Sequence, residues 1–243
     1  MKLKNLRLKK AIFVIGMSCL ITGCNKYEEK EIAIEMEAIS EEKLDQHEII
    51  NDVKLLEEQT IEYKENIYTT ANLNLRETGN IEENIITVID KCQKLVQIED
   101  LGEWSYVKYG ELFGYVSNKY IKELPEDYIE VDISDQNIKY HIGEEIILES
   151  DVVTGKQNSM DTRIGMFEIY GKQTARYLMG NSYVDYWMPF DGGIGLHDAS
   201  WRDEFGGEIY INSGSHGCVN LPFEIAKQIY ETSEVGTKVL VHK

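Results

Sequence analysis

A thiol and two imidazoles in the C-terminal part of the chain supply the residue types of nucleophilic catalysis. Cys218 lies in the run Ser-His-Gly-Cys-Val-Asn at residues 215–220, and His197 lies upstream of it. A cysteine nucleophile reacts as the thiolate, so it needs a base and a group that fixes the tautomer of that base. Gly217 lets the main chain approach a bound carbonyl, where nearby amides face a developing oxyanion. These residues indicate cysteine-dependent acyl chemistry.

The same residue types also build zinc sites, with His197, His216 and Cys218 as three ligands. No carboxylate or fourth ligand stands at a recognisable spacing from them, which counts against this alternative. A lone cysteine is also often only a small buried side chain. The spacing favours catalysis, because 17 residues separate His197 from Ser215.

That spacing, followed by Ser-His-Gly-Cys-Val-Asn, resembles the signature of the L,D-transpeptidase catalytic domain of the YkuD type. The run Tyr-Trp-Met-Pro-Phe at 186–190 and the pair Leu-Pro at 221–222 resemble it too, and the resemblance extends from about Tyr128 to the C-terminus. One departure is Thr-Arg-Ile-Gly at 162–165, where the family often has Thr-Pro-x-Gly. Arg163 loosens that turn, and we expect its exposed cation to be solvated rather than to contact substrate carboxylates.

The resemblance implies a role for each residue of the run. Cys218 becomes the nucleophile and His197 the general base, whose ring is oriented by the main-chain carbonyl of Asp198. His216 becomes a supporting residue, and an exchange of roles between the two histidines stays open. The residues implied for oxyanion or substrate binding are Gly217, Ser215, Asn220 and Asp198. We expect the flanking residues to be packing, namely Trp187, Met188, Trp201 and Arg202.

The implied reaction joins peptidoglycan stem peptides without a metal or other cofactor. Cys218 attacks the carbonyl of the third residue of a donor tetrapeptide and releases the terminal D-alanine, and a neighbouring stem amine then forms a 3-3 cross-link. Water as acceptor would make the protein an L,D-carboxypeptidase. A cell-wall-binding lipoprotein without catalysis is the other alternative. The resemblance also implies acylation by carbapenems, and the sequence leaves the third-position diamino acid open.

Residue order argues against two other cysteine enzymes of the envelope. Papain-like wall hydrolases place the cysteine before the histidine, whereas only His242 follows Cys218 here. Sortases need an arginine after the cysteine, and the last arginine of this chain is Arg202.

The charge distribution indicates export. The formal net charge of -18 argues against nucleic acid as a partner. Residues 1–23 carry five basic and no acidic side chains around a short apolar run, as a signal peptide does. Ile-Thr-Gly-Cys, ending at Cys24, resembles the bacterial lipobox, so Cys24 is the expected lipidation site. We expect a membrane-anchored protein in the cell envelope, on the outer face of the cytoplasmic membrane.

Two segments separate the anchor from the catalytic domain. Residues 24–66 are rich in Glu and Lys and predict an acidic tether, partly helical. Residues 67–124 carry short β-type runs and resemble a bacterial SH3-like domain, with Cys92 where such domains often have glycine. Its role in wall binding or in positioning the enzyme stays open. We expect each aromatic residue here to be core, and Cys92 to be a buried structural thiol.

The fold class is mainly β: a small SH3-like barrel, then a β-sandwich-like catalytic domain over 128–243. Alternation of apolar and polar residues predicts a hairpin over 129–142 with one buried face. Residues 223–233 have one apolar side at helical spacing and predict a short capping helix, followed by a strand at 237–242.

Overall fold

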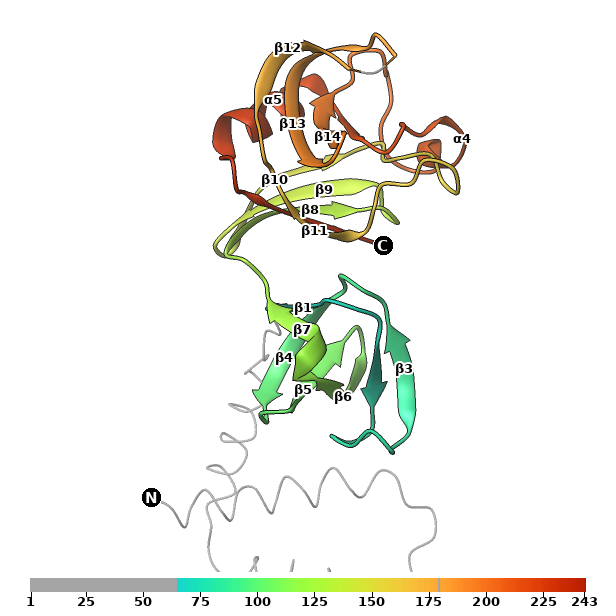
Figure 1. Cartoon of the computed structure of the whole chain (residues 1–243), viewed down its shortest axis with the longest axis vertical. Coiled ribbons are helices and arrows are strands. Elements are labelled where there is room, and N and C mark those ends of the chain that lie inside the picture. Colours follow the sequence, from blue (N-terminus) through green and yellow to red (C-terminus); the bar gives the residue numbers. More distant parts are fainter. Residues whose placement is uncertain (1–64, 179) are drawn as a thin grey trace, which may run out of the picture. The chain divides into compact units, whose positions relative to one another are not determined.

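The computed structural model describes residues 65–178 and 180–243 of the chain (Figure 1). The predicted signal peptide at 1–23, the lipidation site Cys24 and nearly all of the predicted tether at 24–66 lie outside the described residues. Within the described part, no helix has the length and apolar character needed to span a membrane.

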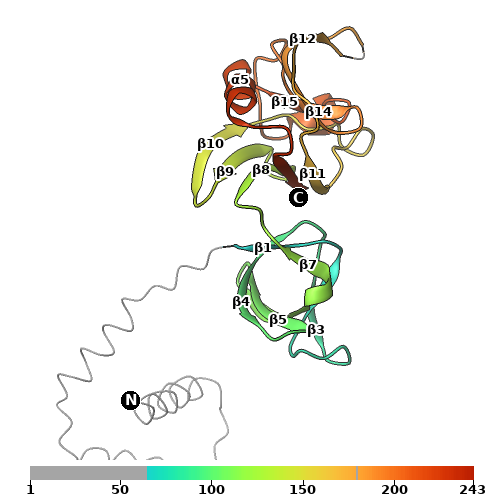
Figure 2. The same cartoon turned by 60° about the vertical axis from the view of Figure 1, so that its left-hand side comes forward.

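The first seven described strands form one antiparallel sheet with the order β3-β2-β6-β5-β4-β1-β7. Their bounds are β1 (Ile67–Thr69), β2 (Leu73–Arg76), β3 (Ile85–Ile89), β4 (Lys94–Asp100), β5 (Trp104–Tyr109), β6 (Leu112–Ser117) and β7 (Ile121–Glu123), with the 3-10 helix η1 (Asn118–Tyr120) before β7. Figure 2 shows these strands curving round a common interior. The buried side chains that fill it are Ile67, Leu73, Leu75, Ile89, Leu95, Val107 and Val116.

Side chains of β5 and β6 alternate between the interior and the outer face. Val107 and Val116 are fully buried, whereas Tyr106 and Tyr115 pair across the strands on the other face with ring centroids 5.0 Å apart. Phe113 also remains exposed. The expected core position is therefore wrong for these aromatics, because side chains alternate along a strand and Val107 and Val116 take the interior positions.

Cys92 lies in the turn before β4 and is buried, with 1% of its surface exposed. Its φ of 66° is in the left-handed region, which glycine adopts at lower cost. Its amide donates to the carbonyl of Thr69, so this turn is held by the main chain. Cys92 and Cys218 are both free thiols, and no disulfide joins them.

The rest of the chain forms two sheets and two helices. Their bounds are β8 (Asp127–Asp132), β9 (Asn137–Ile142), β10 (Glu145–Asp151), β11 (Gly165–Glu168), β12 (Gln173–Tyr177), β13 (Tyr183–Asp191), β14 (Ile194–Asp198), α4 (Ile209–Ser213), β15 (Val219–Leu221), α5 (Phe223–Thr232) and β16 (Lys238–His242). One sheet has the order β10-β9-β8-β16-β11, and the other has the order β12-β13-β14-β15. The prediction of a mainly β chain with a sandwich-like second domain is confirmed. Helix α4 was not expected.

One hydrophobic core lies between the two sheets. Strands β8 and β16 contribute buried valines and isoleucines from one layer, and β13, β14 and β15 contribute side chains from the other. Helix α5 packs on β13 and β14, with Ala226 and Ile229 fully buried. Tyr186 of β13 meets Phe223 and Tyr230 of this helix, with ring centroids 5.6 and 5.2 Å away. The core thus fixes the parallel strands β14 and β15. Strand β14 carries His197, and Cys218 directly precedes β15.

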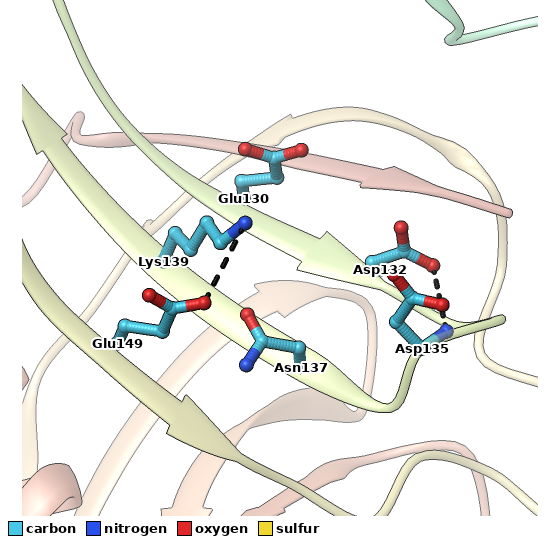
Figure 3. A pocket seen from close by; sticks show the side chains of 6 residues that line it. All are labelled: Glu130, Asp132, Asp135, Asn137, Lys139 and Glu149. Atoms are coloured by element: carbon cyan, nitrogen blue, oxygen red, sulfur yellow. Dashed lines mark hydrogen bonds and ion pairs between the residues drawn. The ribbon is translucent and has the colours of Figure 1, made fainter.

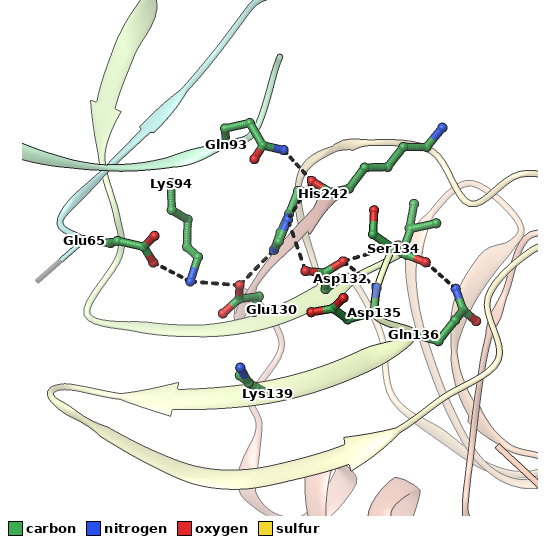
Figure 4. A network of polar contacts seen from close by, with 12 residues as sticks. Glu65, Gln93, Lys94, Glu130, Asp132, Ser134, Asp135, Gln136, Lys139 and His242 are labelled. Carbon is green, nitrogen blue, oxygen red and sulfur yellow. Dashed lines mark hydrogen bonds and ion pairs between the residues drawn. The ribbon is translucent and has the colours of Figure 1, made fainter. Parts of the chain in front are cut away.

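The second face of strand β8 is buried too, which corrects the expected hairpin with one solvated face. Glu130 points away from the sandwich core but is only 5% exposed. Its carboxylate accepts a hydrogen bond from His141 Nε2 at 2.8 Å. It also accepts one from His242 Nε2 at 2.8 Å and lies 2.9 Å from Lys94 Nζ (Figure 4). Lys94 also pairs with Glu65 at 2.7 Å. A buried charge of this kind persists because it is fully paired.

The partners of Glu130 set its protonation. Burial alone would raise the pKa of this carboxyl, but the hydrogen bonds from His141 and His242 and the charge of Lys94 hold it well below its usual range. Burial opposes the charged form of His242, yet Glu130 raises the pKa of that imidazole above its ordinary value. The stabilisation from Glu130 is therefore lost as pH falls below about 4.5. That from His242 is lost as pH rises above about 6.5.

Glu130→Gln should destabilise the fold by about 3–5 kcal/mol, since it leaves Lys94 and two imidazoles without their carboxylate. For the wild type, the free energy of unfolding in urea, measured at pH 4, 5.5 and 8, should be highest at pH 5.5. The variant should lose this maximum. Glu149→Gln is the matched control, because Glu149 is exposed and pairs with Lys139 at 3.5 Å; it should cost less than about 1 kcal/mol. Equal stability of the two variants would contradict this account.

A polar hollow of about 160 Å³ lies beside this network (Figure 3). Its lining comes from β8, β9, β10 and the β8–β9 turn: Glu130, Asp132, Asp135, Asn137, Lys139 and Glu149. Asp132 accepts main-chain hydrogen bonds from Ser134 and Asp135, and Lys139 pairs with Glu149. The hollow contains none of the residues that the sequence assigns to chemistry.

Candidate active site

His197 occupies β14 with its ring held by the main chain. It is 3% exposed, and its Nδ1 donates to the main-chain carbonyl of Asp198 at 2.8 Å. Because a carbonyl only accepts, the proton lies on Nδ1 and Nε2 carries the free lone pair. Burial lowers the pKa of His197, and the charge of Arg202 adds to this, while the hydrogen bond to Asp198 acts in the opposite sense. The ring is therefore a neutral base at pH 7.

The carboxylate of Asp198 has a separate task. Its Oδ1 accepts hydrogen bonds from the main-chain amides of Asp185 and Tyr186, both at 2.8 Å, and its Oδ2 accepts one from the Ser200 hydroxyl at 3.4 Å. The side chain is fully buried. It thus anchors β13 against β14, and only the main-chain carbonyl of this residue contacts the imidazole.

Two tryptophans flank the imidazole. The ring centroids of Trp187 and Trp201 lie 5.8 and 5.9 Å from that of His197, with interplanar angles of 40° and 36°. Trp187 is 4% exposed, whereas Trp201 is 50% exposed. Trp187 therefore packs as expected, while Trp201 presents an exposed ring beside the imidazole of His197.

Cys218 lies one residue before β15, which pairs with the strand of His197. Its partly buried Sγ lies 3.9 Å from the carbonyl of Gly193, in the turn between β13 and β14. Burial raises the pKa of the Cys218 thiol, and a main-chain hydrogen bond from Gly195 only partly offsets this. In the described residues, no hydrogen bond joins this thiol to His197 or His216. Contacts of this kind often tighten only when substrate binds.

Side chains and main chain fix the loop that carries the thiol. The Ser215 hydroxyl donates to the carbonyl of Cys218 at 2.5 Å and accepts the Gly217 amide at 3.0 Å. Gly217 has a φ of 109°, and a Cβ there would lie 3.0 Å from Ile194, so no other residue fits well. The Gly217 amide, which the sequence predicts as an oxyanion donor, is paired with the Ser215 hydroxyl in this structure.

The comparisons with known proteins match this half of the chain. The model of the YkuD family, L,D-transpeptidase catalytic domain, matches residues 126–241. The NMR structure of the catalytic domain of the E. faecium L,D-transpeptidase is 36% identical in sequence, over 49% of this chain and 98% of that one, with a TM-score of 0.45. The chain belongs to the L,D-transpeptidase (YkuD) family.

Two further solved structures are similar to this L,D-transpeptidase. The same E. faecium domain acylated by ertapenem is 35% identical, over 50% of this chain and 100% of that one, with a TM-score of 0.44. A cysteine-to-serine mutant of the Enterococcus faecium L,D-transpeptidase is 24% identical, over 82% of this chain and 83% of that one, with a TM-score of 0.48. No curated protein matches the chain.

Thr162 belongs to the candidate site, and sequence reasoning missed it. It is 3% exposed, and its hydroxyl donates to the carbonyl of Gly217 at 2.8 Å and accepts the amide of Gly155 at 2.9 Å. A Cβ at Gly155 would overlap the carbonyl of Met160, so the chain can approach Thr162 only as glycine. In the Thr-x-x-Gly run at 162–165, the threonine ties this turn to Gly217, the residue before the thiol.

Thr162→Val should slow acylation of Cys218 about tenfold, because the loop loses its link to the turn at 162–165. It should also cost about 1–3 kcal/mol of stability, since the amide of Gly155 and the carbonyl of Gly217 lose a buried partner. Rate constants of acylation and urea unfolding would measure both. Thr162→Ser keeps the hydroxyl and should behave like the wild type. If the valine and serine variants are equally active, the hydroxyl has no such role.

Asn220 is placed beside His197 by the parallel pairing of β14 and β15. Its main chain exchanges two hydrogen bonds with Val153, at 2.9 and 3.0 Å, so the segment after β10 holds this strand from the other side. Its side chain is 2% exposed, and Oδ1 has no partner. Among the described residues, only one other buried side-chain polar atom lacks a partner, Nε of Arg202. Such atoms are rare in folded proteins and often mark functional sites.

The remaining predicted residues take peripheral positions. His216 is exposed and makes no hydrogen bond within the described part of the chain. No group of three or more His, Cys, Asp or Glu side chains among the described residues is arranged to hold a metal ion, so the structure does not bring the alternative zinc ligands together. Arg163 is exposed but forms a bidentate pair with Asp191 rather than being solvated alone.

Proposed function

We propose that the protein forms 3-3 cross-links in peptidoglycan through an acyl-enzyme on Cys218. The sulfur forms a bond to the carbonyl carbon of the third stem residue, and the bond from that carbon to the nitrogen of the terminal D-alanine breaks. A side-chain amine of a second stem then attacks the thioester, forms the new amide and releases the thiolate. One observation carries this proposal: Cys218 directly precedes β15, and β15 pairs with β14, the strand of His197. The imidazole of His197 is buried, and its tautomer is fixed by the carbonyl of Asp198.

The Cys218 thiol and the His197 imidazole are expected to react from their neutral forms. Burial raises the pKa of Cys218 and lowers that of His197, so a standing pair of thiolate and imidazolium is disfavoured. His197 Nε2 takes the thiol proton as the sulfur attacks and gives it to the leaving amine. When the acceptor arrives, the same nitrogen removes a proton from its amine and passes this proton to the released sulfur, which regenerates the thiol and the neutral imidazole.

The charge on the tetrahedral intermediate needs a donor close to the sulfur. The Gly217 amide is occupied by Ser215, so we assign the oxyanion contact to the main-chain amide of Cys218 itself. Ser215 and Thr162 then act by holding the two residues of this turn in place. A preorganised main-chain donor of this kind contributes about 100- to 1000-fold in rate.

Related proteins support the substrate class. The similar E. faecium domain was solved with ertapenem bound as an acyl group, and a carbapenem presents a strained amide to the same kind of thiol. We therefore propose that carbapenems acylate Cys218 here. An L,D-carboxypeptidase would use the same acyl-enzyme with water as acceptor.

The proposal for the rest of the chain rests on its sequence. We propose that Cys24 carries lipid, that residues 24–66 form the tether, and that the enzyme works at the outer face of the cytoplasmic membrane. Residues 67–124 are proposed as the SH3-like domain, with the catalytic domain at 128–243.

Product analysis tests the activity. The full chain would be incubated with a disaccharide tetrapeptide, and the muropeptides separated and weighed by mass spectrometry. A dimer lighter than two substrates by one alanine is expected, with release of free D-alanine. Tripeptide without dimer would favour the carboxypeptidase, and unchanged substrate with a folded, reduced protein would favour the wall-binding lipoprotein.

A further inference from the structure

Arg202 is a partly buried cation without a carboxylate partner in the described part of the chain. Of the five N–H groups of a guanidinium, one donates from Nη2 to the main-chain carbonyl of Ser213 at 2.8 Å. Nε is enclosed and unpaired. Burial lowers the pKa of this side chain, and no ion pair offsets the cost. In a chain with 43 acidic and 25 basic residues, an arginine left unpaired in this way calls for an explanation.

The contact with Ser213 explains only part of this arrangement. Ser213 is the last residue of α4, and a cation at the carboxyl end of a helix is favourable. One N–H group satisfies that carbonyl, however, and both hydrogens of Nη1 remain without an acceptor in the described residues. An arginine whose sole task was to cap α4 would not need to be desolvated.

The position of Arg202 relates it to both partners of the proposed reaction. The charge of Arg202 contributes to the lowered pKa of His197, the proposed base. Trp201, the preceding residue, lies tilted beside the same imidazole and has an exposed ring. Ser213, which holds the guanidinium, lies two residues before Ser215 and the loop of Cys218. Arg202 is therefore linked to the base through its neighbour Trp201 and to the loop of Cys218 through Ser213.

The proposed reaction puts a carboxylate close to His197. The base gives its proton to the nitrogen of the leaving residue, so this nitrogen lies at His197 when the bond breaks. The leaving residue is the C-terminal one, and its carboxylate carbon is two bonds from this nitrogen. We propose that Arg202 binds the terminal carboxylate of the donor stem peptide and so selects donors with a free C-terminus. This inference rests on the proposed function and adds a specificity residue to it.

A pair of substrates that differ only at this group tests the proposal. The full chain would be acylated by a disaccharide tetrapeptide with a terminal carboxylate and by the same compound with a terminal carboxamide, and kcat/KM for D-alanine or D-alaninamide release compared. A preference for the carboxylate of about 10- to 100-fold is expected for the wild type, the range of a hydrogen bond between charged groups. Arg202→Met should abolish the preference, so that kcat/KM is about equal for the two substrates. Arg202→Lys should keep part of the preference.

The ratio of kcat/KM for the carboxylate substrate to that for the carboxamide substrate, taken within one variant, separates loss of recognition from loss of folding. A structural loss in Arg202→Met lowers the rates of both substrates and leaves their ratio unchanged, so a retained preference would overturn the proposal. Arg163→Met is the matched control, because this exposed arginine is already paired with Asp191; it should keep the wild-type preference. A wild type that releases both leaving groups equally well would overturn the role of Arg202 alone. A wild type that releases neither would overturn the transpeptidase function and this proposal together.

Discussion

Replacing Cys218 with alanine is expected to abolish both acyl-enzyme formation and cross-linking, with a loss of at least about 10⁴-fold in the rate of donor consumption. The reason is chemical: the thiol is the group that becomes bonded to the donor, and no other thiol lies in this loop. Consumption of a disaccharide tetrapeptide by the full chain, followed by mass spectrometry, measures it. The fold should be retained, because Cys218 Sγ has only a weak contact with the carbonyl of Gly193 at 3.9 Å.

The matched control uses the other thiol of the described part. Cys92 is buried in the turn before β4 and belongs to a separate cluster with Tyr68, Tyr128 and Leu240. Cys92→Ala keeps the Cβ and the same main-chain demand, so it should cross-link at the wild-type rate. Equal loss of activity in both variants would mean that Cys218 acts through the fold and not as the nucleophile.

Replacing His197 with glutamine is expected to slow acylation about 10²- to 10⁴-fold at pH 7, the usual contribution of a general base. Glutamine can still donate to the main-chain carbonyl of Asp198, so the strand should stay in place, but it cannot take a proton. The pH dependence should change as well. Burial lowers the pKa of His197 below 6.5, so wild-type acylation should remain fast at pH 6.5 and fall only at lower pH.

Without the imidazole, acylation depends on thiolate formed in solution. Burial raises the pKa of Cys218 above 9.0, so the rate of His197→Gln should rise about tenfold per pH unit between pH 6 and 9. Stopped-flow measurement of acylation across this range would show it. His216→Gln is the control, because His216 is exposed and makes no hydrogen bond in the described residues; it should lose less than about tenfold. If His216→Gln shows the larger loss, the two histidines have exchanged roles.

The order and spacing of residues in the sequence predicted the fold class and placed His197 and the loop of Cys218 on neighbouring segments. A fixed spacing between His197 and the loop of Cys218 is a strong signal, because parallel strands β14 and β15 must bring these segments together. Alternation along β8 and the apolar side of α5 likewise predicted which side chains are buried between the sheets. Local patterns of this kind are visible in one sequence because each strand or helix repeats them.

Contacts between distant segments were not predictable in the same way. Thr162 contacts the carbonyl of Gly217 across 55 positions of the chain, and a threonine in a turn has no pattern that reveals such a partner. Glu130 appeared to belong to a solvated face of β8, because strand alternation does not show that Lys94 and His242 cover it. Arg202 appeared to be packing, since only the structure shows that its charge lacks a carboxylate.

Intact-protein mass spectrometry of the full chain with a disaccharide tetrapeptide, quenched before turnover is complete, tests the central claim most directly. The account predicts one adduct whose added mass equals the donor minus D-alanine, located on the peptide that contains Cys218 and absent from Cys218→Ala. An adduct of the same mass that persists in Cys218→Ala would contradict the account. So would cross-linked product formed by the wild type without any covalent intermediate on that thiol.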